Sequence, residues 1–385
     1  MLYKMDKPDW LPPTKSFVMT TPLCKKLPLR YPIIQAPMAG VSTPELAAAV
    51  SNAGALGSLG LGASSPEEAA RLIRQTQALT RQPFNVNLFC HSPAIRHEAV
   101  EQAWIARFAD RFAALGAQAP VHLEEIYPTF CGHEAMLQVI EETRPAVVSF
   151  HFGLPPADTL RRLKACRIVT LATATSVAEA EEIAQQGIDM IVAQGYEAGG
   201  HRGSFAAEGD DHQLSTLTLI QAINARVALP VIAAGGIMNG AAISAMLALG
   251  ASGVQSGTAF LLCPESATTP AWRQALRDAA VTGTTMTAAI SGREARCLRN
   301  TFCKIAHAIP RTEIPAYPLA YSLGKALAKA ALAQGETGFG AYWAGEGAPL
   351  ARELPAADVI RELVTEWHAA SGQGSLTDAI QPFSL

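Results

Sequence analysis

The sequence predicts an α/β fold, a (β/α)8 TIM barrel with a smaller helical cap domain. Eight short apolar segments alternate with helical patterns, and this alternation is typical of parallel βα units. Several segments are apolar throughout, as strands covered on both faces are, and no hairpin pattern links them. A doubly wound open sheet would show the same alternation, so the pattern leaves that fold open. The expected strands lie at 31–36, 55–60, 84–89, 146–152, 167–173, 189–194, 230–235 and 252–258.

Helix signals occupy the connections between these strands. The first connection offers Ser42 or Thr43 as an N-cap, with Pro44 in the first turn, and Gly54 then ends the helix. The segments 64–79, 176–187 and 239–251 follow the same scheme. A longer connection, 91–145, exceeds an ordinary crossover, so we expect it to carry extra helices.

Composition excludes several classes of function. Charged residues make up 16% of the chain and apolar residues 49%, which fits many elements buried on both faces. Thirty basic and 33 acidic residues give a net charge of −3, so there is no electrostatic basis for binding nucleic acid. The seven cysteines have neither CxxC nor Cys/His ligand spacing, so we expect no metal site and no disulfide framework.

One stretch, 227–264, contains no charged residue and is long enough to span a bilayer. Its glycines and Pro230 divide it into a strand, a turn, a helix and a strand, so we expect no membrane segment. Residues 1–17 carry charges and prolines where a signal peptide needs an apolar run. Together with reduced thiols, these features predict a cytoplasmic protein, whereas the sequence does not predict the oligomeric state.

The regular βα pattern stops between about residues 264 and 334. This region mixes a Thr-rich stretch, a basic cluster and a helix-like segment, YSLGKALAKAALAQG. We therefore expect a barrel formed by 1–263 and 335–385, and a small helical cap formed by 264–334.

Uncharged, glycine-rich turns follow the last two expected strands, where barrels of this type usually bind phosphate. Gly235 and Gly236 allow the main chain to approach an anion, and the next helix offers free N–H groups. The turn 255–258, Gln-Ser-Gly-Thr, adds hydroxyl groups. Neither loop contains Lys or Arg, so the main chain would hold the phosphate. For one loop, glycines that only permit a tight turn would explain the pattern, but two adjacent loops favour phosphate binding.

Four polar residues interrupt three of the expected strands: Asn85, Asn87, His151 and Gln194. A buried polar group without a partner costs about 1–3 kcal/mol, so each needs a hydrogen bond. Carboxamides, which both donate and accept, suit the edge of a heterocycle. A hydrogen bond to a neighbouring strand end is the alternative for any single residue.

The segment 194–205, QGYEAGGHRGSF, leaves a strand and presents His201 and Arg202 between glycines. An imidazole is the usual acid or base near neutral pH and, when protonated, an anion partner. A lone histidine is more often structural, but its place on a glycine-flanked loop favours a functional role.

Four blocks of the sequence resemble the motif blocks of class I nitronate monooxygenases, formerly called 2-nitropropane dioxygenases. The blocks are QAPMAGVSTPELAAAVSNAGALGS (35–58), FNVNLFCHSPA (84–94), VVSFHFGLP (147–155), and ATATSVAEAEEI (172–183) with IVAQGYEAGGHRGSF (191–205). The resemblance extends from about residue 30 to about residue 345. It implies a TIM barrel with a small cap, non-covalently bound FMN, and oxidation of alkyl nitronates, notably propionate 3-nitronate, by molecular oxygen.

The resemblance also implies roles for individual residues. The residues expected to hold or line the FMN are Pro37, Met38, Ala39, Asn87, Gln194, Gly199, Gly235, Gly236, Gln255, Ser256, Gly257 and Thr258. His151 and His201 would act on the substrate, and Tyr127, Tyr317, Tyr321 and Lys325 would bind it.

Spacing supports the cap residues independently, because Tyr321 and Lys325 share one helical face and a lysine among phenols suits a carboxylate. A solvated lysine beside packed tyrosines is the alternative. Glu346, in the glycine loop WAGEG, has no evident role.

The expected reaction is one-electron transfer from the nitronate to the flavin, followed by capture of oxygen. A nitronate is already a carbanion equivalent, so no strong base is needed, and a protonated His201 would stabilise its charge. If neutral nitroalkanes are also accepted, His201 would act as a base. Three alternatives stay open: an NAD(P)H-dependent flavin reductase on the same scaffold (quinone or enoyl-acyl-carrier reductase), a barrel synthase or isomerase, and a flavin-binding protein without turnover.

Overall fold

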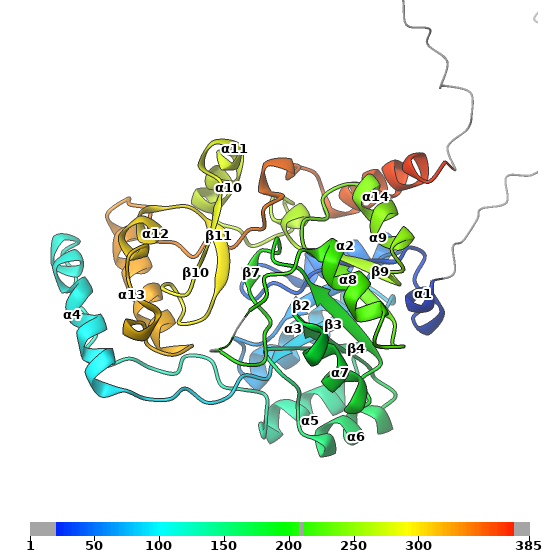
Figure 1. Ribbon diagram of the computed structural model, residues 1–385, viewed down its shortest axis with the longest axis horizontal. Helices are drawn as coiled ribbons and strands as arrows, with labels where there is room; N and C mark the ends of the chain where they lie inside the picture. The colour runs from blue at the N-terminus through cyan, green and yellow to red at the C-terminus, as the bar shows by residue number, and fades with distance from the viewer. Residues whose placement is uncertain (1–20, 208, 210, 373–385) are drawn as a thin grey trace, which may run out of the picture.

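The computed structural model, which describes residues 21–207, 209 and 211–372, contains the expected barrel (Figure 1). Eight parallel strands follow the order β1-β9-β8-β6-β5-β4-β3-β2, and a single bridge between Ile34 and Leu56 joins the two outer strands. The strands are β1 Ile33–Gln35, β2 Gly57–Gly60, β3 Phe84–Phe89, β4 Val147–His151, β5 Val169–Ala174, β6 Met190–Gln194, β8 Val231–Ala234 and β9 Gly253–Ser256. All eight sequence-predicted strands are present, so the open sheet is excluded.

Helices cover the barrel on its outer side. They are α2 Pro44–Asn52, α3 Pro66–Leu79, α5 Glu134–Thr143, α6 Ala157–Ala165, α7 Val177–Gln185, α8 Thr216–Asn224, α9 Gly240–Ala248 and α14 Ala356–Ala370. The predicted caps are used: the side chains of Thr43, Ser65, Ser176 and Asn239 each accept a hydrogen bond from the main-chain N–H three residues ahead. These bonds satisfy N–H groups that a helix leaves unpaired at its start.

The interior of the barrel is filled at the end where the strands begin. A short helix, α1 (Pro22–Lys26), places the fully buried Leu23 against an apolar layer that includes Leu171 and Ile232. The carboxyl ends of the strands are therefore the end left open for a ligand. The uncharged stretch 227–264 forms β8, α9 and β9, and no helix among the described residues is long and apolar enough to cross a bilayer.

The expected cap is not purely helical. It contains α10 (Pro270–Arg277), α11 (Ala279–Thr282), α12 (Thr301–Ala306) and α13 (Leu319–Ala333), but also β10 (Thr284–Thr287) and β11 (Ala295–Leu298). These two antiparallel strands, with β7 (Gly200–His201), form a three-stranded sheet. The Thr-rich stretch explains the difference, because β-branched residues favour strands.

The long connection 91–145 does carry extra helices, and one of them packs in the cap. Helix α4 (Glu98–Ala114) lies beside α13 in Figure 1, although the two are far apart in sequence. Trp104 and Phe108 of α4 share a hydrophobic core with Phe302 and Leu323, and the rings of Phe108 and Phe302 stack at 5.4 Å. The division into a barrel (1–263 and 335–385) and a cap (264–334) stays a prediction, and its ends, 1–20 and 373–385, lie outside the described residues.

Candidate active site

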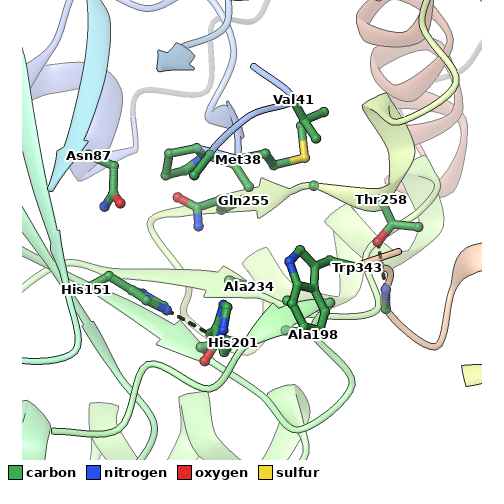
Figure 2. Close-up of a pocket in the computed structure, with 18 of the residues that line it drawn as sticks. Met38, Val41, Asn87, His151, Ala198, His201, Ala234, Gln255, Thr258 and Trp343 are labelled. Carbon is green, nitrogen blue, oxygen red and sulfur yellow. Dashed lines mark hydrogen bonds between the residues drawn. The ribbon is translucent and has the colours of Figure 1, made fainter. Parts of the chain in front are cut away.

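A cavity of about 270 Å³ lies at the carboxyl ends of the barrel strands, beneath the cap (Figure 2). Every residue that the family resemblance assigned to a cofactor or a substrate lines it. These residues are Pro37, Met38, Ala39, Tyr127, Asn87, His151, Gln194, Gly199, His201, Gly235, Gly236, Gln255, Ser256, Gly257, Thr258, Tyr317, Tyr321 and Lys325. The fold thus brings the predicted residues together, whereas the role of each stays a prediction.

The turns after β8 and β9 form a cradle of unpaired main-chain donors at one end of the cavity. Gly235 and Gly236 have φ angles of +123° and +70°, which favour glycine. Within the described residues, the N–H groups of Gly236, Ile237 and Thr258 have no hydrogen-bond partner. Lys325 is the one lysine or arginine among the described residues that line the cavity, and it comes from the cap. An anion at the cradle would therefore be bound by main-chain dipoles.

The side chains of these turns hold the cradle in shape. The Ser256 hydroxyl donates to the carbonyl oxygen of Ile237 at 2.9 Å, which ties the two turns together. Thr258 Oγ1 accepts from the N–H of Gly345 at 3.0 Å, so its own hydrogen is free to donate elsewhere. Gly199 is needed for space, since a Cβ there would lie 2.4 Å from the nitrogen of Gly345.

Two carboxamides face the middle of the cavity in Figure 2. Asn87 donates from Nδ2 to the carbonyl oxygen and the hydroxyl of Ser149, at 3.2 and 2.9 Å, which leaves its Oδ1 available. Gln255 has no side-chain hydrogen bond among the described residues. Asn85, grouped with these residues by sequence, is fully buried and does not line the cavity.

The carbonyl oxygen of His201 accepts hydrogen bonds from two barrel side chains. Gln194 Nε2 donates to it at 3.0 Å, and His151 Nε2 lies 3.2 Å from it. Because a carbonyl can only accept, His151 carries its proton on Nε2, and its Nδ1 accepts from Thr173 Oγ1 at 3.0 Å. Gln194 also accepts from the N–H of Gly203 at 2.8 Å. Both side chains therefore position the loop that carries His201.

The imidazole of His201 is oriented by the cap. Its Nε2 lies 2.9 Å from Ser291 Oγ, whose own hydrogen is donated to the carbonyl oxygen of Arg293 at 3.0 Å. His201 Nε2 is therefore the donor, and Nδ1 carries the lone pair. Within the described residues Nδ1 has no hydrogen-bond partner, so it is the available acceptor of this ring.

The histidines around the cavity are neutral at physiological pH. Burial lowers the pKa of His201 to about 3, and it lowers the pKa values of His151 and His91 to about 4. The nearby positive charge of Arg293 acts in the same direction on all three. A protonated His201, as expected beside the substrate, finds no counter-charge among the described residues, and burial disfavours the imidazolium.

Aromatic side chains of the cap and of the segment that follows it form the wall around His201. The ring of His201 lies 4.9 Å from Trp343 and 5.4 Å from Tyr317, measured between centroids. Lys325 Nζ lies over the rings of Tyr127 and Tyr321, at 5.1 and 5.4 Å from their centroids, and has no carboxylate partner among the described residues. The cavity thus ends in a cation held by two phenols.

Two residues singled out by sequence point away from the cavity. Arg202 is 2% exposed, pairs with Asp211 at 2.8 Å, and donates to the carbonyl oxygen of Gln194, so it anchors the loop. Glu346, whose role the sequence left open, pairs with Arg296 at 3.1 Å.

Sequence reasoning missed the residues that orient the site. Ser291, which binds the imidazole of His201, lies outside every motif block. Thr173, which binds the imidazole of His151, lies in the block 172–183 but was given no role, because a single hydroxyl in a strand or loop is common. Trp343 stands in the WAGEG segment, which drew notice only for Glu346. The signal that could have identified Trp343 is a tryptophan that stands shortly before two glycines, Gly345 and Gly347.

Comparison with known proteins identifies the family. The family model described as nitronate monooxygenase matches residues 20–366. The chain belongs to the nitronate monooxygenase family. It is similar to the nitronate monooxygenase of Paraburkholderia phytofirmans, with 54% identity over 87% of this chain and 92% of that protein. It also resembles the nitronate monooxygenase of Pseudomonas aeruginosa, with 51% identity over 90% of this chain and 99% of that protein. The chain is therefore an oxidoreductase that oxidises nitronates.

Solved structures share the nitronate monooxygenase architecture. The nitroalkane oxidase of Streptomyces ansochromogenes superposes with a TM-score of 0.83 at 37% identity, over 92% of this chain and 99% of that one. FabK from Thermotoga maritima superposes with a TM-score of 0.70 at 28% identity, over 92% and 98% of the two chains. The identities rank the nitroalkane oxidase nearer to this chain than FabK.

The neutral histidines predict a pH-dependent stability. In the unfolded chain an imidazole titrates near pH 6.5, so below that pH the unfolded state binds more protons than the folded state. The free energy of unfolding should therefore fall as the pH falls from about 6.5 toward the folded-state pKa of about 3. His201→Asn removes one such group, and its free energy of unfolding should fall less between about pH 7.5 and about pH 5.

Urea unfolding at the two pH values measures this difference. His307→Asn changes an exposed histidine and serves as the control. An equal pH dependence in the wild-type protein and His201→Asn would contradict the neutral assignment.

Proposed function

We propose that this protein is an FMN-dependent enzyme that oxidises alkyl nitronates, with propionate 3-nitronate as a substrate, using molecular oxygen. One observation carries the proposal. A single cavity has a cation-free cradle of main-chain donors at one end, and at the other a histidine and a lysine among aromatic rings. This division suits a cofactor phosphate at the first end and a small anionic substrate at the second.

The residues present fit FMN. Its phosphate would be held by the N–H groups of Gly236, Ile237 and Thr258, which are not bonded to any group of residues 21–207, 209 and 211–372. The free Oδ1 of Asn87 and the carboxamide of Gln255 would meet the polar edge of the flavin ring. Pro37, Met38 and Ala39 of the β1–α2 loop would line the ring.

When bound, FMN supplies the electron acceptor and the reactivity toward oxygen, and the protein supplies orientation and proton management. A nitronate needs no base, because its α-proton has already left. A neutral nitroalkane still holds that proton, and Nδ1 of His201 is the unprotonated acceptor that faces the cavity. We therefore assign His201 as the base for neutral nitroalkanes. His151, whose two ring nitrogens are both engaged, is assigned as a positioning residue.

The cap would select the substrate. Lys325 lies at the exposed edge of the cavity, against Tyr127 and Tyr321, and a carboxylate could pair with its ammonium group. Propionate 3-nitronate carries a carboxylate in addition to the nitronate group, whereas ethyl nitronate does not. The proposed site can therefore distinguish these two substrates.

The second candidate function is the NAD(P)H-dependent flavin reductase that the sequence left open, and the fold that this chain shares with FabK does not distinguish it from the first. Oxygen consumption measured with propionate 3-nitronate, and separately with NADH, distinguishes the two. Rapid consumption with NADH and none with nitronate would overturn the proposed function.

The first prediction concerns the phosphate cradle. Gly236→Asp adds a side chain at a φ of +70° and a negative charge where the phosphate would lie. The purified variant should be folded but colourless, as measured by flavin absorbance per chain and by circular dichroism. Gly187→Asp, with a φ of +78° at a position that does not line the cavity, imposes the same backbone strain and should stay yellow. Full flavin occupancy in Gly236→Asp would show that the phosphate does not bind at this turn.

The second prediction concerns Lys325. Lys325→Met keeps the packing of the side chain but removes its charge. Loss of a charge-assisted hydrogen bond costs about 1.5–3 kcal/mol, so kcat/KM for propionate 3-nitronate should fall about tenfold to a hundredfold. Ethyl nitronate should be affected little. Lys329→Met, one turn further along α13 and exposed, is the control. Equal losses on both substrates would show that Lys325 is structural.

The third prediction concerns His201. Gln194 and His151 bond to the carbonyl oxygen of His201 and not to its side chain. The loop should therefore keep its conformation in His201→Asn, and the variant should still bind the flavin. Turnover of neutral nitroethane should fall by about 10²–10⁴-fold, and that of ethyl nitronate much less. Oxygen-electrode assays with both substrates measure this. If His201→Asn keeps its activity on nitroethane while His151→Asn loses it, the base is His151.

A further inference from the structure

Trp343 stands on a segment that crosses the cavity between the cap and the barrel. We call residues 342–346 the return strap. Its main chain bonds to β11, since Leu298 donates to the carbonyl oxygen of Tyr342 at 2.8 Å and Ala344 donates to that of Arg296 at 3.3 Å. Its other end bonds to the barrel, where Gly345 donates to Thr258 Oγ1 at 3.0 Å. Trp343 is thus held from both sides.

Glu346 is part of this attachment. Its N–H donates to the carbonyl oxygen of Glu197 at 3.0 Å, and its carboxylate pairs with Arg296 at 3.1 Å. Arg296 is 5% exposed and also donates to the carbonyl oxygen of Tyr196 at 2.9 Å. These contacts fix the strap, and therefore the indole, relative to the barrel.

The indole of Trp343 makes one directional contact. Its Nε1–H donates to the Oη of Tyr321 at 3.2 Å, while its ring lies 4.9 Å from that of His201. An indole N–H can only donate, so the phenol oxygen must be the acceptor. The hydroxyl hydrogen of Tyr321 then has to point elsewhere, and no described residue accepts it. Burial raises the pKa of Tyr321 to about 12, so this hydrogen is retained at neutral pH.

We propose that Trp343 is a positioning residue that makes the Tyr321 hydroxyl a hydrogen-bond donor to an oxygen of the bound nitronate group. The inference rests on the proposed function and specifies how its site recognises the anion. A phenol can otherwise donate or accept, because its hydrogen rotates. With its acceptor side occupied by an indole, Tyr321 offers the cavity a donor alone.

The geometry assigns this donor to the nitronate group rather than to the carboxylate. Lys325 Nζ lies over the ring of Tyr321, whereas the Tyr321 hydroxyl bonds to the indole of Trp343. Because the ring of Trp343 lies 4.9 Å from that of His201, the hydroxyl is directed toward the reacting end of the cavity. Lys325, one turn along the helix, is the group available for a carboxylate. A donor binds an anionic nitronate more strongly than a neutral nitro group, so the pair also favours the nitronate form.

A double-mutant cycle tests the proposal with ethyl nitronate, which has no carboxylate. Tyr321→Phe removes the donor and should raise KM about 10-fold to 100-fold, with a smaller change in kcat. Trp343→Phe keeps the ring but frees the hydroxyl to rotate, and should raise KM about 2-fold to 10-fold. In the Tyr321→Phe background, Trp343→Phe should have no further effect on KM. Trp343→His, which keeps a ring N–H, should recover part of the affinity.

The controls separate this role from general packing. Trp104→Phe removes an indole N–H from the cap core, outside the cavity, and should leave KM unchanged. All variants are compared at equal flavin occupancy. If Trp343→Phe raises KM equally with and without the Tyr321 hydroxyl, the indole only shapes the cavity and the proposal is overturned. It is also overturned if the KM effect is confined to propionate 3-nitronate. Failure of the wild-type protein to oxidise any nitronate would instead reject the proposed function itself.

Discussion

The hydrogen bonds to the carbonyl oxygen of His201 are the contacts on which the rest of the site depends. Gln194 and His151, both on barrel strands, donate to this one oxygen. The same residue pairs with Ala295 of β11, so a two-residue strand joins the barrel wall to the cap sheet. Because the main chain makes this joint, the imidazole is left free to act, with its tautomer set by Ser291. If the side chain of His201 made this joint instead, the imidazole could not also bind a substrate.

The cavity separates two ways of binding an anion. At the turns after β8 and β9, unpaired N–H groups and helix ends supply only partial positive charges. These partial charges need no counter-ion when no anion is bound there. At the cap, Lys325 supplies a full positive charge. Its contact with two phenol rings offsets part of the free-energy cost of removing water from the ammonium group when a ligand binds. Between them the histidines stay neutral, since burial and Arg293 oppose their protonation. Among the described residues that line the cavity, Lys325 therefore carries the one full positive charge.

The sequence predicted what depends on local pattern and failed where distant segments meet. The barrel strands were predictable because they are buried on both faces, and the caps at Thr43 and Ser65 because a hydroxyl at a helix start has one main use. The strands of the cap sheet were missed, since β7 consists of Gly200 and His201 alone and exists only by pairing with β11.

In the candidate site, too, the sequence predicted local features but not contacts between distant segments. The family motifs placed Gln194 and His151 at the cavity, but their hydrogen bonds run to the loop of His201 and were not visible in any motif. The lowered pKa of His201 was not predicted, because it depends on burial by Tyr317 and Trp343, which lie more than a hundred residues away along the chain.

The packing of α4 against α13 has a consequence for how the chain folds. The cap core needs Trp104 and Phe108, which are synthesised early, together with Phe302 and Leu323, which are synthesised after all eight barrel strands. Contacts of such large sequence separation carry a high loop-closure cost and form late. During synthesis, the apolar face of α4 must therefore wait without its partner while the barrel assembles. Transiently exposed apolar surface favours misassociation, so the segment between β3 and β4 is at risk until the cap has been synthesised.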